Sequence, residues 1–102
     1  MGTLNPSKIS PKQRRWLKSR AHSLKPTIWV GEDGISAGIG AAVSEALRTH
    51  ELVKVRLRRP ENKTDTAESV AASAAAHLVA IVGHTAILYR AREEKPSIVL
   101  PT

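Results

Sequence analysis

The sequence predicts a two-layer α/β fold of the α+β kind, with helices packed on a mixed four-stranded sheet in the order α-β-α-β-α-β-β. Three observations lead to this class. Short runs of apolar residues alternate with polar ones, longer stretches between them carry helical apolar spacing, and the chain of 102 residues has the length of one domain. We assign residues 1–8 to a flexible N-terminal arm and residues 9–102 to a single domain.

The first helix is expected to begin at Pro11 and to end near His22. Ser10 is a favourable N-cap, and Pro11 suits the first helical position, where a missing backbone N–H costs nothing. One sector of the helical wheel is apolar, and the opposite sector carries Arg14, Arg15 and Lys18. The helix therefore has one face for a core and one for solvent or a ligand.

The next elements follow from alternation and spacing. Residues 27–30 predict a short strand, and residues 31–34 predict a tight loop. A helix over 36–49 has apolar residues at steps of four, although two glycines weaken its first turn by about 1 kcal/mol each relative to alanine. The clearest strand covers 52–58, with an apolar face and a basic face that contains Lys54 and Arg56.

The last part of the chain predicts a helix and a hairpin. The helix is expected to begin near Asp65, with Asp65 as its cap. Two strands, 78–82 and 85–90, are separated by Gly83-His84, which favours a type II′ turn. Residues 98–100 predict a short final strand.

Positive charge is concentrated at the start of the chain. The net charge is +7, and the first 30 residues hold seven Lys and Arg but no acidic residue, whereas nine basic and nine acidic residues balance in the rest. A field of one sign attracts polyanions, of which nucleic acid is the commonest. A solvated basic surface or a disordered basic tail is the alternative interpretation.

The sequence holds little that indicates catalysis. It has no cysteine, and its four histidines show no metal-ligand spacing. Glu32 and Asp33 are adjacent in a predicted loop, an arrangement typical of a solvated turn. We therefore expect no enzyme activity, no metal, no cofactor and no small-molecule substrate. Without a long apolar run or a leader we also expect no membrane contact and a cytoplasmic location.

The predicted loop from Gly31 to Gly34 has the pattern G-x-x-G. Glycines at this spacing let backbone N–H groups approach a phosphate, and KH domains use such a loop to hold a nucleic-acid backbone. Asp-Gly is also a common turn, and the charges of Glu32 and Asp33 oppose a phosphate. Both interpretations remain open from the pattern alone.

The three aromatic residues are too few for a base-stacking sheet surface of the RRM or OB kind. For each we favour packing over stacking. Trp16 is expected in the core, Trp29 is ambiguous within its strand, and Tyr89 is expected to be half-exposed.

Several linked motifs resemble the CRM domain family, and in particular its free-standing bacterial YhbY-like members. The matching stretches, which span about residues 8–101, are 12–18, 21–26, 30–36, 50–55, 82–90 and 98–101. The resemblance implies a fold similar to the C-terminal domain of bacterial translation initiation factor three. It also implies RNA binding, and association with large-subunit ribosomal RNA precursors during ribosome assembly. Glu32 departs from the family, which often has a basic or small polar residue there, and Arg20 stands where an apolar residue is common.

We therefore predict a non-catalytic, monomeric RNA-binding protein that assists ribosome assembly. The predicted phosphate contacts are Lys12, Arg14, Arg15, Lys18 and Lys25. Gly31 and Gly34 would let the chain pass close to the RNA, and second-rank contacts are Lys54, Arg56 and Arg90. A protein–protein adaptor with a basic face is the alternative, and double-stranded DNA binding is a third possibility that no DNA-binding motif supports.

Overall fold

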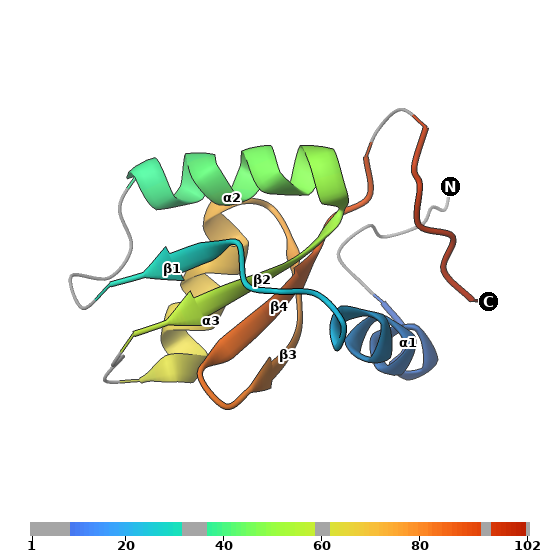
Figure 1. Cartoon of the computed structure of the whole chain (residues 1–102), viewed down its shortest axis with the longest axis horizontal. Helices are drawn as coiled ribbons and strands as arrows, with labels where there is room; N and C mark the ends of the chain where they lie inside the picture. The colour runs from blue at the N-terminus through green and yellow to red at the C-terminus, as the bar shows by residue number, and fades with distance from the viewer. Residues whose placement is uncertain (1–8, 32–36, 59–61, 93–94, 102) are drawn as a thin grey trace.

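The structure of the protein, a computed structural model, describes residues 9–31, 37–58, 62–92 and 95–101. Its helices are α1 (Pro11–Ala21), α2 (Ala37–His50) and α3 (Lys63–Ser73), and its strands are β1 (Ile28–Val30), β2 (Leu52–Leu57), β3 (His77–Val82) and β4 (Thr85–Tyr89). The α+β class and the predicted order of elements are confirmed (Figure 1). The predicted arm, residues 1–8, lies outside the described residues.

The four strands form one mixed sheet in the order β1-β2-β4-β3. β1 runs parallel to β2, and both β2 and β3 run antiparallel to β4. The predicted hairpin joins β3 to β4, and Gly83 at its first turn position has a φ of +60°. A positive φ at that position, filled by glycine, is the requirement of a type II′ turn.

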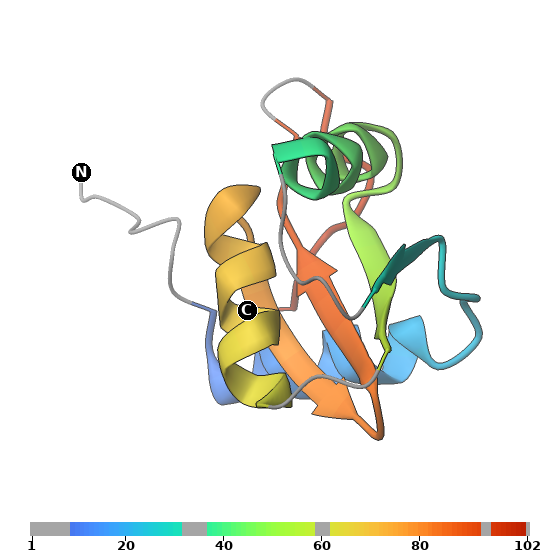
Figure 2. The same cartoon turned by 90° about the vertical axis from the view of Figure 1, so that its left-hand side faces the viewer.

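Alternate residues of the strands enter two separate cores. One core lies between the sheet and helices α2 and α3, and Figure 2 shows α3 beside the sheet and α2 above it. The sheet residues in this core are Val53, Val55, Leu57, Ala86 and Leu88. The other joins α1 to Leu52, Val79, Ile87 and Tyr89. Because neighbouring residues of a strand point to opposite faces, α1 covers the face that α2 and α3 leave free. The sheet is thus covered on both sides, and α1 adds a layer that a two-layer arrangement does not contain.

α1 begins and ends where the sequence predicts. The Ser10 hydroxyl accepts a hydrogen bond from the Gln13 backbone N–H at 3.0 Å, and the Gln13 side chain accepts one from the Ser10 N–H at 2.9 Å. This reciprocal pair is a capping box, and His22 is the C-cap. Leu17 and Ala21 are fully buried against the sheet, which fixes the orientation of the helix.

Two predictions about the C-terminal half are wrong. α3 is capped by Asn62, whose side chain accepts from the Asp65 N–H at 3.0 Å, so Asp65 lies inside the first turn rather than at the cap. Residues 98–100 do not form a strand. Ile98 and Leu100 instead pack their side chains against the α1 core, and the Pro101 carbonyl accepts a hydrogen bond from Gln13 Nε2 at 3.0 Å.

The weak glycine-containing start of α2 is held by close packing against α3. A Cβ atom at Gly40 would lie 3.2 Å from Ser73 Oγ and 3.3 Å from Ser73 Cβ. Glycine at this position therefore lets the two helices approach, which compensates for its poor helix propensity.

Glu51 joins the end of α2 to the C-terminal segment. The residue is fully buried and has a φ of +63°. One oxygen of its carboxylate accepts from the Ser97 N–H (2.6 Å), the Ser97 hydroxyl (2.6 Å) and the Ile98 N–H (3.0 Å), and the other accepts from the Arg92 N–H (2.9 Å). Burial raises the pKa of this carboxyl, but the hydrogen bonds from Ser97, Arg92 and Ile98 outweigh it, and the pKa falls below its ordinary value of 4.5.

We expect Glu51→Gln to lower the free energy of unfolding near neutral pH by about 1.5–3 kcal/mol. Both carboxylate oxygens of Glu51 accept hydrogen bonds, whereas one end of the glutamine amide is an NH₂ group that can only donate. A lowered pKa stabilises the fold above the unfolded-state pKa, and this contribution is lost as the pH falls through the folded-state value. Urea denaturation at several pH values measures both effects. The stability gap between wild type and variant should narrow as the pH falls below 4.5, the ordinary pKa of the carboxyl group, and a gap that stays constant would contradict this role.

Candidate nucleic-acid interface

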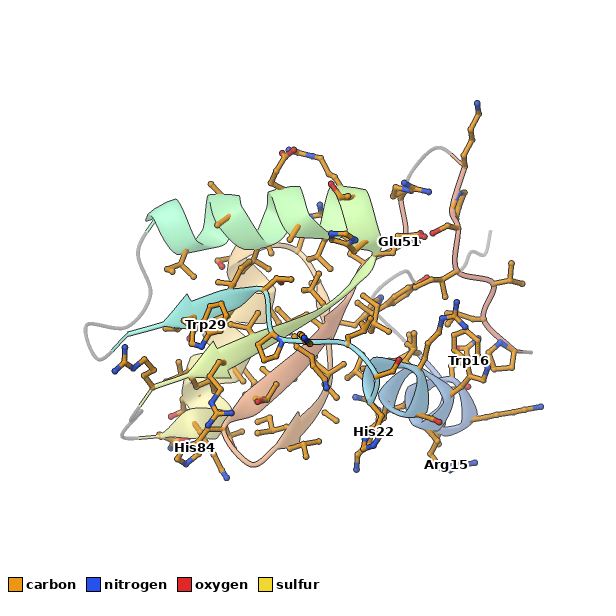
Figure 3. The ribbon with its side chains drawn as sticks, viewed as in Figure 1. Arg15, Trp16, His22, Trp29, Glu51 and His84 are labelled. Carbon is orange, nitrogen blue, oxygen red and sulfur yellow. The ribbon has the colours of Figure 1, made fainter. Side chains whose placement is uncertain are left out.

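The exposed face of α1 carries a stripe of basic side chains. Arg15 and Lys18 are exposed and lie one turn apart, and His22 continues the stripe at the helix end. Figure 3 shows Arg15 and His22 pointing from α1 toward the same side of the molecule. Lys12 is also exposed, one turn before Arg15.

A groove separates this stripe from the open part of the sheet. It has a volume of about 290 Å³ and is lined by Lys18, His22, Pro26, Lys54, Arg56, Val82, Thr85 and Ile87. We refer to it as the α1–sheet groove. Lys54 and Arg56 reach it because they alternate with the buried Val53, Val55 and Leu57 of β2. No acidic side chain is among these lining residues, so the groove has one sign of charge.

The cations of the groove differ in their internal contacts. Lys54 Nζ donates to the Leu24 carbonyl at 3.0 Å, which positions its ammonium group beside the segment after α1. Within the described ranges, Arg15, Lys18 and Arg56 form no ion pair; Arg48, on α2, pairs with Glu45 at 2.7 Å. The field of the groove is therefore not neutralised by neighbouring carboxylates of the described residues.

Arg14 and Arg90 use their guanidinium groups inside the fold. Arg14 Nη1 donates to the carbonyls of Leu78 and Val79, at 2.7 Å each. Arg90 Nη1 donates to Ser44 Oγ and to the Ala74 carbonyl, and its Nη2 donates to the Ser44 carbonyl at 3.0 Å. These hydrogen bonds join secondary-structure elements, and the RNA contacts predicted for both residues stay predictions.

Lys25 and Gly31 are not among the residues that line the groove. Lys25 is exposed and lines a second hollow of about 450 Å³, together with Arg20, Thr27 and His50 among others. Gly31 is exposed directly after β1, and a Cβ there would meet no atom within 4 Å. The described structure thus gives no packing reason for glycine at this position. Gly34 lies outside the described residues.

The aromatic residues divide between packing and exposure. Tyr89 is buried and stacks on His77 with ring centroids 6.0 Å apart, so the expectation that it is half-exposed is wrong. Trp16 is partly buried against the α1 core, with the Arg20 guanidinium 5.3 Å from its ring centroid. Trp29 is 56% exposed, and the preference for packing is wrong for this residue.

Sequence reasoning missed two residues of this surface. His22 is not among the predicted contacts, although its spacing of four from Lys18 places both on one helix face. Trp29 carries a clearer signal, because its neighbours Ile28 and Val30 belong to the opposite face of the same strand.

The described part of the chain shows neither a metal site nor a membrane span. No group of three or more His, Asp or Glu side chains that could hold an ion occurs in it. None of its helices has the length and apolar character needed to cross a bilayer.

The sheet order, the helices on both of its faces and the groove lined by basic side chains define a small α+β domain with a cationic groove. The family model of the CRS1 / YhbY (CRM) domain matches residues 9–90. The chain therefore belongs to this domain family, as the sequence motifs predicted.

Curated relatives are named as RNA-binding proteins. The chain is 36% identical over 95 residues to the probable RNA-binding protein YqeI of Bacillus subtilis, an alignment that covers 91% of this chain and 99% of the relative. It is 34% identical over 88 residues to an RNA-binding protein of Haemophilus influenzae, with 84% and 89% of the two chains covered.

A solved structure has the same fold. The solution structure of the hypothetical protein SAV1595 from Staphylococcus aureus, described as a candidate RNA-binding protein, superposes with a TM-score of 0.80 at 29% identity. The match covers 92% of this chain and all of the other.

The different positions of Arg14 and Arg15 give a direct test of their roles. We expect Arg14→Ala to lower the free energy of unfolding by about 1 kcal/mol, because two carbonyls lose a charged donor. Arg15→Ala removes the same charge from the exposed face and should change stability by less than about 0.5 kcal/mol. Urea denaturation of both variants measures the difference, and equal losses of stability would contradict the assignment.

Proposed function

We propose that this protein binds RNA, with the α1–sheet groove and the adjoining face of α1 as its contact surface. The observation that carries the proposal is the groove itself, whose lining holds Lys18, Lys54, Arg56 and His22 and no carboxylate. A concave surface of one sign concentrates a polyanionic ligand by its electrostatic field. Membership in a family whose curated relatives are named RNA-binding proteins selects RNA as that polyanion.

The central phosphate contacts are assigned by exposure and by the absence of an internal hydrogen bond within the described residues, and further basic residues are added by their position beside them. Arg15, Lys18 and Arg56 form the centre of the proposed surface, because each presents its cation without an internal partner among the described residues. Lys54 at the groove, Lys12 on α1 and Lys25 after the helix extend it. Arg14 and Arg90 are left out, since carbonyl groups of the fold already hold them. Gly31 and Gly34 remain candidates for close approach of the backbone.

The resemblance to YhbY-like proteins extends the proposal to a biological setting. We propose that the RNA is ribosomal, within precursors of the large subunit, and that the protein acts there as a non-catalytic cytoplasmic monomer. The motifs that carry this resemblance, including residues 12–18 and 82–90, contribute the α1 stripe and the β4 strand beside the groove. The binding surface would then recognise the RNA backbone inside an assembling particle.

Salt dependence tests the phosphate contacts. If about five phosphates are neutralised on single-stranded RNA, the slope of log K against log salt should be about −3.5. Combined replacement of Arg15, Lys18 and Arg56 by Ala should reduce the slope to about −1.4 and weaken binding similarly for RNAs of different sequence. Fluorescence anisotropy with labelled oligonucleotides over a range of salt measures both.

Arg48→Ala is the matched control for this triple variant. Arg48 is an exposed arginine too, but it lies on α2 and is paired with Glu45. Its replacement should leave the salt slope unchanged. A wild-type salt slope near zero would contradict phosphate binding at the groove. So would an Arg48→Ala variant whose salt slope falls as much as that of the triple variant.

The proposed association with large-subunit precursors is tested by sedimentation of the tagged protein through gradients at low and high salt. The RNA that crosslinks to the protein is sequenced. We expect co-sedimentation with large-subunit precursor particles at low salt and release at high salt. Nuclease treatment should also release the protein. Retention of protein partners after nuclease would favour the adaptor hypothesis instead.

A further inference from the structure

Trp29 is an exposed indole on a short edge strand. Its neighbours Ile28 and Val30 pack into the core shared with α2 and α3, so Trp29 points to the other face of the sheet, where 56% of it is exposed. Within the described residues, the aromatic contacts join His77 to Tyr89 and Arg20 to Trp16, and Trp29 takes part in neither. Figure 3 shows Trp29 over the strands, far from Trp16.

The surroundings of Trp29 are cationic. In the parallel ladder Trp29 is the direct partner of Arg56, and strands of a sheet lie roughly 4.8 Å apart. Arg56 in turn lines the α1–sheet groove beside Lys54 and Lys18. The indole therefore lies at the end of a row of cations that begins on α1 and crosses the sheet.

We propose that Trp29 is a base-stacking residue for single-stranded RNA, whose phosphates lie along Arg56, Lys54 and Lys18. This inference rests on the proposed RNA binding and adds the state of the RNA that is recognised. One indole beside a row of cations matches a base and the neighbouring phosphates of an unpaired strand. In a duplex the bases are stacked on each other and cannot reach the indole.

The chemistry also distinguishes RNA from an acidic polypeptide. Carboxylates would satisfy the cations of the groove, but they offer no flat ring to cover the indole. Every nucleobase has such a face, so stacking on Trp29 requires no particular sequence. The surface should thus prefer unpaired over paired RNA while reading few or no base identities.

Trp fluorescence provides the test, because Trp16 and Trp29 are the two tryptophans of the chain. In a Trp16→Phe variant, emission reports Trp29 alone, and a single-stranded ten-nucleotide RNA should quench it. In a Trp29→Phe variant, emission reports Trp16 alone, and the same RNA should cause little quenching. An RNA duplex and poly-glutamate are the comparison ligands for the Trp16→Phe variant, and both should quench weakly.

Affinity measurements separate stacking from charge. Trp29→Ala should weaken binding of the single strand by about tenfold, because the base that stacks on the indole loses its aromatic partner. Its salt slope should match that of wild type, because the phosphate contacts remain. Trp29→Phe keeps a ring and should retain most of the affinity, and circular dichroism checks that both variants are folded.

The outcomes distinguish this inference from the proposed function. Stacking on Trp29 is overturned if Trp29→Ala binds RNA as tightly as wild type and RNA does not quench the Trp16→Phe variant. The proposed RNA binding still stands in that case if the affinity of wild type falls with salt. Equal quenching by the duplex or by poly-glutamate also overturns it. If wild type binds none of the RNAs, both proposals fail.

Discussion

The packing of α1 against one half of a sheet face determines the rest of the surface. Leu17 and Ala21 are fully buried against the sheet, which fixes which side of the helix remains in solvent. A helix of 11 residues is only about 16 Å long, so part of the face stays uncovered. The side chains of Arg56 and Thr85 lie in this uncovered part, and Lys18 lies at its border. The packing of α1 on the sheet thus forms the second core and also leaves the α1–sheet groove beside it.

Arginines with similar sequence surroundings have different physical roles in this chain. Arg14 and Arg15 are adjacent, yet one donates to strand carbonyls and the other faces solvent. Buried or partly buried carbonyls need donors, and a guanidinium can supply several at once. Total charge therefore overstates the number of cations available to a ligand, and Arg90 is a second example of a guanidinium used within the fold.

Much of the fold could be predicted because its signals are local. The alternation around Val53 and Val55, the Ser10 cap and the Gly83 turn are each decided by a few neighbouring residues. The Glu51 contacts could not be predicted, since they depend on where residues more than 40 positions away return to the helix end. Residues 98–100 have the composition of a strand, but they pack by their side chains and find no strand partner.

The candidate site could be predicted only in part, for a related reason. The sequence indicates the basic faces of α1 and β2 separately, through helical and strand spacing. That Lys18 and Lys54 border one groove depends on the position of α1 over the sheet, and no local pattern carries this information. Likewise, the exposure of Trp29 depends on how far α1 extends.

The position of Arg14 also has a consequence for self-association. β3 is an outer strand of the sheet, and its register is irregular between Leu78 and Ala80. Unpaired carbonyls on an outer strand are acceptors for a strand of another molecule, which can begin aggregation. Arg14 occupies the Leu78 and Val79 carbonyls at this irregularity, so a foreign strand would have to displace a charged side chain before it could pair there. One arginine of the basic helix thus occupies backbone acceptors at the outer border of the sheet.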